Sequence, residues 1–230
     1  DLFKEQVQKQ SKDKIFLSNL KNEKKIFSWQ DVEISVLKFA NEISKIIEKG
    51  DRCLLLSENR PEWMISDLSI MLAGGITVPA YTTYVTRDYE YIINDCNPSI
   101  VVVSNDDQYN KIKNICERNI SIKKIFSFEN LSELNKNSFI NVNTIIEKKS
   151  ENITFELKLS AQRSDPACII YTSGTQGNPK GVILSHGGIL SNCEGGYELL
   201  KPILEKETRF LTWLPLSHSY EHAVQFIQIA

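Results

Sequence analysis

Residues 52–80, RCLLLSENRPEWMISDLSIMLAGGITVPA, contain two short aliphatic runs separated by a longer mixed segment. The runs at 52–57 and 76–80 have the length and apolar character of buried β-strands. Between them a helix is expected to open at Pro61, because proline lacks an N–H and the first helical turn leaves that donor without an intrahelical partner. The glycine pair at 74–75 is expected to end this helix. The stretch is interpreted as a strand–helix–strand unit.

The same alternation continues toward the carboxyl terminus. Two further aliphatic runs, 100–104 and 122–128, are expected to be strands, and the amphipathic segments 86–95 and 108–118 are expected to be helices. Strands that alternate with helices at this spacing are typical of βαβ crossovers, which join parallel strands. We therefore expect an α/β fold with mainly parallel sheets flanked by helices.

Another helix is expected before the first of these strands. Ser28 followed three residues later by Asp31 is a capping-box pattern for its start, and Gly50 is expected to stop it. The apolar residues that share one face at i, i+3, i+4 spacing are Val36, Phe39, Ala40, Ile43, Ile46 and Ile47.

Composition excludes several classes of protein. A formal net charge of -2 over 230 residues supplies no basic field for nucleic acid or an anionic membrane, so anionic ligands must be bound locally. The five cysteines are widely spaced without a C-x-x-C pair, which favours reduced thiols over a zinc knuckle or a disulfide framework. No stretch reaches the roughly 18 apolar residues of a membrane span. We expect a cytoplasmic protein, and the polar start without Met is interpreted as a missing natural start.

The apolar run at 167–171 leads into residues 171–181, YTSGTQGNPKG, and a second apolar run follows at 182–184. Glycines let a backbone turn sharply and bring its N–H groups close to anionic oxygens. Thr172, Ser173 and Thr175 add hydroxyl donors, and Lys180 supplies a positive charge. The pattern predicts a loop that binds the phosphates of a nucleotide.

The same loop can be compared with three other sequence patterns. A cluster of Gly, Ser, Thr and Pro is often a simple turn. The Walker pattern fails because Lys180 lies three places after Gly177 and is followed by Gly181. The dinucleotide fingerprint fails because Gly174 and Gly177 lack the remaining glycine at the required offset.

Residues 171–181 resemble the phosphate-binding motif of the AMP-forming acyl-CoA synthetases, relatives of luciferases and of peptide-synthetase adenylation domains. Gln176 replaces the second threonine of the commonest motif, which removes one hydroxyl but keeps a polar donor. Segments 59–63, 74–81 and 214–218 look like long-chain fatty acid ligases. The resemblance implies a layered large domain of which 1–230 is a partial amino-terminal AMP-binding domain. We expect a first α/β subdomain over 1–160, the phosphate-loop strand and the start of a second subdomain over 161–230, and an absent carboxy-terminal domain.

The resemblance also implies a reaction and its site. ATP and a carboxylic acid give acyl-AMP and pyrophosphate, and coenzyme A then displaces AMP; Mg²⁺ assists. The partners implied are a fatty acid, ATP and CoA, with peripheral membrane contact as a further expectation. Lys180 and Thr175 are the implied catalytic residues, Thr172 the Mg²⁺ ligand, and His218 a residue of the acyl and pantetheine channel. The residues implied to bind the ATP phosphates are Thr172, Ser173, Gly174, Thr175, Gln176, Gly177, Lys180 and Gly181.

Two rival hypotheses concern the function, one based on the end of the chain and one on the loop. His218, Glu221 and His222 satisfy the H-x-x-E-H pattern of a zinc metallopeptidase, with Glu221 as general base. His218 is equally compatible with a helix-start residue bonded to backbone. A non-catalytic nucleotide-binding module also fits the loop, since binding phosphate does not require turnover. As an amino-terminal fragment, the chain alone is expected to show no adenylation.

Overall fold

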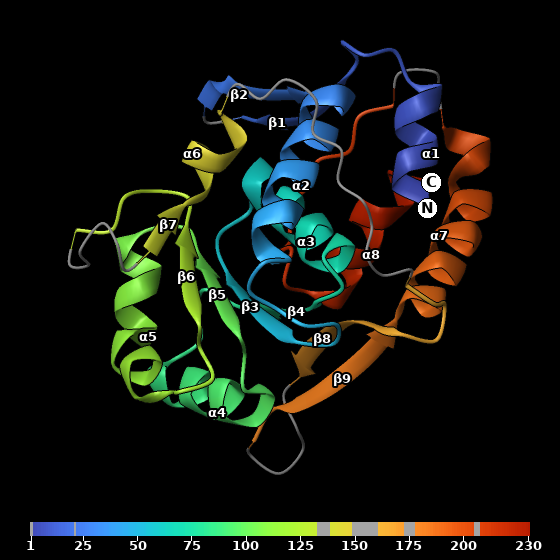
Figure 1. Ribbon diagram of the computed structural model, residues 1–230. Coiled ribbons are helices and arrows are strands. Elements are labelled where there is room, and N and C mark those ends of the chain that lie inside the picture. Colours follow the sequence, from blue (N-terminus) through green and yellow to red (C-terminus); the bar gives the residue numbers. More distant parts are fainter. Residues whose placement is uncertain (1, 21, 133–138, 149–160, 173–177, 205–207) are drawn as a thin grey trace.

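The computed structural model describes residues 2–20, 22–132, 139–148, 161–172, 178–204 and 208–230 (Figure 1). A seven-stranded sheet has the order β7-β6-β5-β3-β4-β8-β9, and its neighbouring strands are parallel except β8 and β9. The predicted α/β class and mainly parallel sheet are confirmed. The strands of this sheet are β3 (Arg52–Leu56), β4 (Ile76–Ala80), β5 (Ile100–Val103), β6 (Lys124–Ser127), β7 (Phe139–Asn141), β8 (Pro166–Thr172) and β9 (Lys180–Ser185).

Helices cover both faces of the sheet, each over its own apolar cluster. Alternate residues of β3 point to opposite faces: Leu54 and Leu56 pack with α4 and α5, whereas Cys53 and Leu55 pack with α2 and α3. The predicted helices at 61–73, 86–95 and 108–118 are confirmed. Their observed bounds are α3 (Pro61–Leu72), α4 (Thr86–Cys96) and α5 (Asp106–Arg118).

Helix α2 (Trp29–Ile43) begins as predicted and ends earlier than predicted. The Ser28 hydroxyl accepts a hydrogen bond from the Asp31 N–H at 3.1 Å, and the Asp31 carboxylate accepts one from the Ser28 N–H at 2.9 Å. The helix stops at Ile43, so its predicted extension to Gly50 is wrong. Gly50, at φ +87°, instead donates its N–H to the Gly74 carbonyl at 2.8 Å and turns the chain into β3.

Several elements had not been predicted. Helix α1 (Leu2–Lys9) and the antiparallel pair β1 (Ile15–Asn19) and β2 (Asn22–Ser28) precede α2, and α6 (Val142–Ile146) follows β7. In the N-terminal part the rings of Phe16 and Trp29 stack with centroids 3.9 Å apart. No helix within the described ranges has both the length and the apolar character to cross a bilayer.

Strands β8 and β9 extend the sheet beyond β4. The one backbone pairing between described residues of β4 and β8 joins Thr77 to Cys168; Pro79, which has no N–H to donate, lies two residues further along β4. The predicted strands at 167–171 and 182–184 are confirmed, but β9 already begins at Lys180. The sheet therefore runs on past residue 160, and the expected division into subdomains stays a prediction.

The remaining helices follow β9 in the chain. Ser185 caps helix α7 (His186–Leu200) by accepting a hydrogen bond from the Gly188 N–H at 3.1 Å. A short 3₁₀ turn, η1 (Lys201–Ile203), follows, and α8 (Ser219–Ile227) crosses α7 near its carboxyl end. In Figure 1 α7 lies on the right, beyond the upper end of β9, and α8 lies between α3 and α7.

Candidate nucleotide site

The two ends of the predicted phosphate loop face each other at the carboxyl edge of the sheet. Thr172 is the last residue of β8 and Lys180 the first of β9, and they are register partners in the antiparallel pair. The Thr172 hydroxyl lies 3.5 Å from the Lys180 carbonyl oxygen, the long limit of a hydrogen bond. Thr172, Lys180 and Gly181 are all exposed, so they can meet a ligand. The other predicted phosphate-binding residues, Ser173, Gly174, Thr175, Gln176 and Gly177, lie outside the described residues.

Gly181 has a packing role that sequence reasoning did not assign. A Cβ built on Gly181 would lie 2.8 Å from Ile169 Cγ2 and 3.2 Å from Tyr171 Cζ. The Tyr171 ring therefore covers the position that a side chain would need. The tyrosine that opens the motif and the glycine that closes it are cross-strand neighbours.

Tyr171 is itself held by two side chains from the segment that follows β4. Its hydroxyl donates to Asp95 Oδ2 at 2.5 Å, and the Tyr84 hydroxyl donates to its carbonyl oxygen at 3.3 Å. Burial, together with the bond to Asp95, raises the pKa of the Tyr171 hydroxyl. Tyr171 is 3% exposed, so its ring is part of the core while its hydroxyl reaches Asp95, an exposed residue near the end of α4.

His218 lies at the same edge of the sheet. It is the N-cap of α8, and its Nδ1 accepts a hydrogen bond from the Tyr220 N–H at 3.2 Å, which confirms the helix-start interpretation. Its exposed ring stands edge-on to Tyr81, with centroids 6.4 Å apart, and Tyr81 directly follows β4. Tyr81 contacts Tyr84 at 5.1 Å between centroids, so an aromatic series joins His218 to the end of β8.

The zinc-peptidase hypothesis finds no support in this geometry. His222 is buried and its Nε2 lies 2.7 Å from Asp67 Oδ2, while Glu221 accepts a hydrogen bond from Gln225 at 3.3 Å. The described residues contain no group of three or more His, Cys, Asp or Glu side chains placed to hold a metal ion. The two histidines of the pattern serve a helix cap and a buried ion pair instead.

That ion pair between α8 and α3 was not foreseen from the sequence. Burial alone would lower the pKa of His222, but the charge of Asp67, its hydrogen bond and a contact with Cys168 raise it to about 10. The ring also lies edge-on to Trp63, with centroids 5.5 Å apart. A charged His222 thus fastens α8 against α3 and β8.

The point between the carboxyl ends of β3 and β5 is where doubly wound sheets commonly bind ligands. Here the side chains bond to one another: Glu58 accepts from Gln108 at 2.6 Å, and Arg60 donates to Glu129 at 3.0 Å. The Arg60 guanidinium also lies 5.2 Å above the Phe128 ring. These internal contacts leave the β8–β9 edge as the better candidate.

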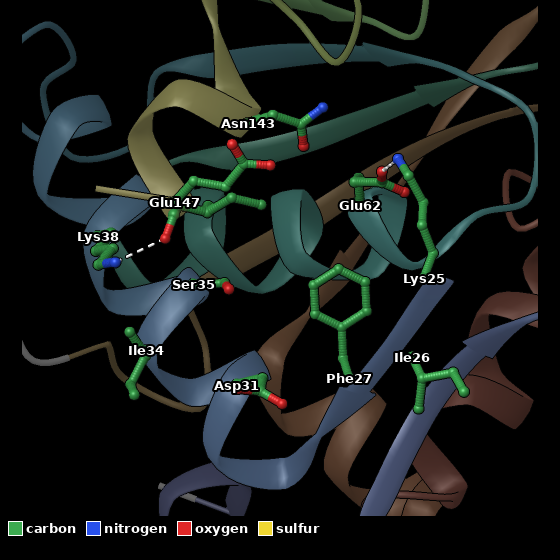
Figure 2. Close-up of a pocket in the computed structure, with 11 residues that line it drawn as sticks. Lys25, Ile26, Phe27, Asp31, Ile34, Ser35, Lys38, Glu62, Asn143 and Glu147 are labelled. Carbon is green, nitrogen blue, oxygen red and sulfur yellow. Dashed lines mark hydrogen bonds and ion pairs between the residues drawn. The ribbon is translucent and has the colours of Figure 1, made fainter. Parts of the chain in front are cut away.

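Figure 2 shows a cavity of about 480 Å³ between β2, α2, α6 and the start of α3. Three of its charged groups bond within the chain: Lys25 pairs with Glu62, and the Lys38 ammonium donates to the Ile146 carbonyl at 2.6 Å. None of the predicted site residues that the structure describes lines it. We therefore do not place the nucleotide there.

These features define an α/β domain whose glycine- and hydroxyl-rich motif joins two neighbouring strands at the carboxyl edge of a parallel sheet. The family model described as AMP-binding enzyme matches residues 3–229, so the chain belongs to the AMP-binding enzyme family.

Individual relatives agree with this assignment. Long chain acyl-CoA synthetase 3 of Arabidopsis thaliana is 32% identical over 211 residues, covering 86% of this chain and 31% of the relative. Long-chain-fatty-acid–CoA ligase FadD15 of Mycobacterium tuberculosis is 30% identical over 185 residues, covering 79% of this chain and 30% of the relative. This chain thus spans about a third of the length of either relative. The crystal structure of ATP-bound MatB from Rhodopseudomonas palustris shares the fold, with a TM-score of 0.79 at 21% identity over 99% of this chain and 43% of that one.

Proposed function

We propose that the protein containing this chain uses ATP to activate a fatty acid, first to acyl-AMP and then to acyl-CoA. The observation that carries the proposal is the placement of Thr172 and Lys180 side by side, both exposed, at the two ends of the phosphate-binding motif. Family membership and two relatives named as long-chain acyl-CoA ligases support the reaction and the substrate class.

The chemistry explains why a cation and hydroxyls are needed at this place. The fatty acid carboxylate attacks the α-phosphorus of ATP, the bond to the bridging oxygen breaks, and pyrophosphate leaves with that electron pair. Both reactants are anions, so the Lys180 charge and the loop donors offset their repulsion and stabilise the departing pyrophosphate. In the second step the CoA sulfur attacks the acyl carbon, AMP leaves, and the thiol proton is released.

Magnesium belongs to this proposal as a cofactor. The Thr172 hydroxyl is an exposed oxygen donor next to Lys180, and Mg²⁺ prefers oxygen ligands while keeping phosphate oxygens and water in its shell. Thr172 would hold the ion together with the nucleotide, and Mg²⁺ when bound neutralises phosphate charge. A cytoplasmic location and peripheral contact with membranes stay predictions, which fractionation of cells would test.

Acid-dependent ATP–pyrophosphate exchange by the complete gene product, measured over carboxylic acids of increasing chain length, tests the proposal. Exchange should require a fatty acid, and Lys180→Ala should reduce it by about 100-fold, the usual effect of removing one transition-state donor. Thr175→Ala, in the same motif, should also reduce exchange.

Lys45→Ala is the matched control, because Lys45 is an exposed lysine whose ammonium pairs only with Glu42 among the described residues. It should exchange like wild type. Loss of activity in Lys45→Ala equal to that in Lys180→Ala would contradict a specific role for Lys180. ATP binding without any exchange would favour the non-catalytic nucleotide-binding module.

A further inference from the structure

We propose that Tyr84, Asp95 and Tyr171 form a clamp of positioning residues that sets where Thr172 and Lys180 stand at the edge of the sheet. The three residues belong to the segment after β4 and to the end of β8. The inference rests on the proposed function, because it assigns these side chains a task in ATP binding.

The first part of the clamp acts on the side chain of Tyr171. Its hydroxyl is fixed by Asp95 of α4 at 2.5 Å, and its ring lies against Gly181, 3.2 Å from the place where a Cβ would stand. Gly181 is the register partner of Tyr171 and the neighbour of Lys180. Fixing the ring from α4 therefore also fixes the start of β9, from which the Lys180 side chain extends.

The second part acts on the backbone of Tyr171. The Tyr84 hydroxyl donates to the Tyr171 carbonyl at 3.3 Å, one residue before Thr172. Backbone pairing between β4 and β8 is confined, within the described strands, to Thr77 and Cys168, four residues before Thr172. The Tyr84 hydroxyl thus adds a link between the two strand ends beyond that backbone pairing, and the edge-on contact with Tyr89, at 5.9 Å between centroids, helps to orient the Tyr84 ring.

Neither contact is needed to build the core, since the apolar parts of all three side chains stay in place when a hydroxyl or carboxylate is removed. A Tyr-to-Phe substitution deletes one hydrogen bond and keeps the ring. The clamp therefore predicts a change in the placement of β8 and β9 without loss of the fold.

The test uses the complete gene product with Tyr84→Phe, Tyr171→Phe and Asp95→Ala. Each should raise the KM for ATP in pyrophosphate exchange by about three- to tenfold, the range for one hydrogen bond to a carbonyl or a charged group. The KM for the fatty acid should not change. Asp95→Asn keeps an acceptor for the Tyr171 hydroxyl and should restore most of the affinity.

Double variants separate the two contacts. Tyr171→Phe combined with Asp95→Ala should be no worse than either alone, because both remove the same bond. Tyr84→Phe combined with Asp95→Ala should raise the KM for ATP more than either single variant does, because the two substitutions remove different hydrogen bonds. Tyr197→Phe is the matched control, since Tyr197 is an exposed tyrosine of α7 whose contact with the Lys201 ammonium uses the ring and not the hydroxyl; it should behave like wild type.

Hydrogen–deuterium exchange of peptides from 166–172 and 180–185 gives a readout that does not depend on activity. Faster exchange there in Tyr171→Phe and Asp95→Ala than in Tyr197→Phe supports the clamp, and unchanged protection overturns it. Absence of pyrophosphate exchange by the wild-type protein would sink the proposed function while leaving this comparison intact. A lower thermal midpoint with an unchanged KM for ATP would also overturn the clamp, because it describes a merely structural role.

Discussion

At the scale of single residues, Asp67 and His222 form a buried ion pair. Their side chains are 0% and 3% exposed, and they join helices whose residues lie 155 positions apart in the chain. Asp67 Oδ1 has no hydrogen-bond partner among the described residues, so the carboxylate depends on His222 for its main compensation. A buried ion whose partner is removed keeps its desolvation cost and loses its attraction.

Asp67→Ala should therefore lower the free energy of unfolding by about 3 to 5 kcal/mol. The double variant Asp67→Leu/His222→Met, which replaces the pair by apolar side chains, should recover most of that loss. Urea unfolding followed by circular dichroism measures both. Glu117→Ala, at an exposed position of α5, is the control and should change the free energy of unfolding by less than about 0.5 kcal/mol. An equal loss of stability in Asp67→Ala and Glu117→Ala would contradict the special role of the buried pair.

The same pair predicts how stability depends on pH. The pKa of His222 rises from its ordinary 6.5 to about 10 in the folded protein, so the folded state binds a proton that the unfolded state has released. The contribution of protonated His222 to the free energy of unfolding is therefore complete below pH 6.5 and is lost as pH rises toward 10. The free energy of unfolding should fall over this window by at most about 1.4 kcal/mol per pH unit. His222→Gln should flatten the slope, and an identical slope in wild type and variant would refute the assignment.

At the residue scale, local patterns were visible in the sequence and distant partners were not. The capping box of Ser28 and Asp31 could be predicted because its two residues are three apart. His222 matched a zinc motif by spacing, but its real partner, Asp67, lies far away in the chain and carries no local mark of that contact. Asp95 likewise gave no signal before the sheet brought α4 to Tyr171.

Among the elements, α7 and α8 show how one glycine sets a helix crossing. A Cβ on Gly196 of α7 would lie 2.3 Å from Cδ1 and 2.8 Å from Cγ1 of Ile227, whereas a Cβ on the adjacent Gly195 meets nothing within 4 Å. The two glycines therefore stand in the same helix with opposite surroundings. Close approach of the helices requires glycine at one position and not at the other.

Gly195→Ala should raise the free energy of unfolding by about 0.5 to 1 kcal/mol, since alanine is the better helix former and space is free. Gly196→Ala should lower it by about 1 kcal/mol, because overpacking against Ile227 outweighs the same gain. Thermal unfolding of the two single variants measures the difference. Adding Ile227→Ala to Gly196→Ala should remove the penalty for the added methyl; a penalty that persists would place the clash elsewhere.

Elements with strong periodic patterns were predicted well, whereas elements defined by tertiary contacts were missed. The aliphatic runs that became β3, β4 and β5 needed only their own composition. The extension of α2 to Gly50 was wrong, because Ile47 is 7% exposed and keeps its core contacts from a turn as well as it would from a helix. Strands β1 and β2 contact α2, but β2 begins with four polar residues at 22–25 and lacks the apolar alternation that marks a strand in the sequence.

At the scale of the whole molecule, the five cysteines are spread through the sheet and helices, and all are free and buried. Burial raises the pKa of Cys193 to about 11 and those of Cys96 and Cys116 to about 12. The expectation of reduced, unpaired thiols agrees with this arrangement. These three thiols are both shielded and protonated at neutral pH, so they are poor nucleophiles.

Alkylation by iodoacetamide should therefore report unfolding of the whole domain. At pH 8 the folded protein should take up little label, and in urea all five cysteines should react. Intact-mass spectrometry over a urea series counts the labels. A control without reducing agent should give the same five, since no disulfide joins these residues; stoichiometric labelling of one cysteine in the native protein would show that its surroundings open separately.

Pro79 is a point at which β4 cannot donate a backbone hydrogen bond to a neighbouring strand, because proline has no N–H. Strands that share a continuous backbone ladder keep a spacing of about 4.8 Å whatever their side chains are. Beyond Thr77 the ends of β4 and β8 are instead linked through the Tyr84 hydroxyl, which a Tyr84→Phe substitution removes. The end of β8, where the motif begins, can therefore shift relative to β4 when the Tyr84 hydroxyl is lost, while the rest of the sheet keeps its register.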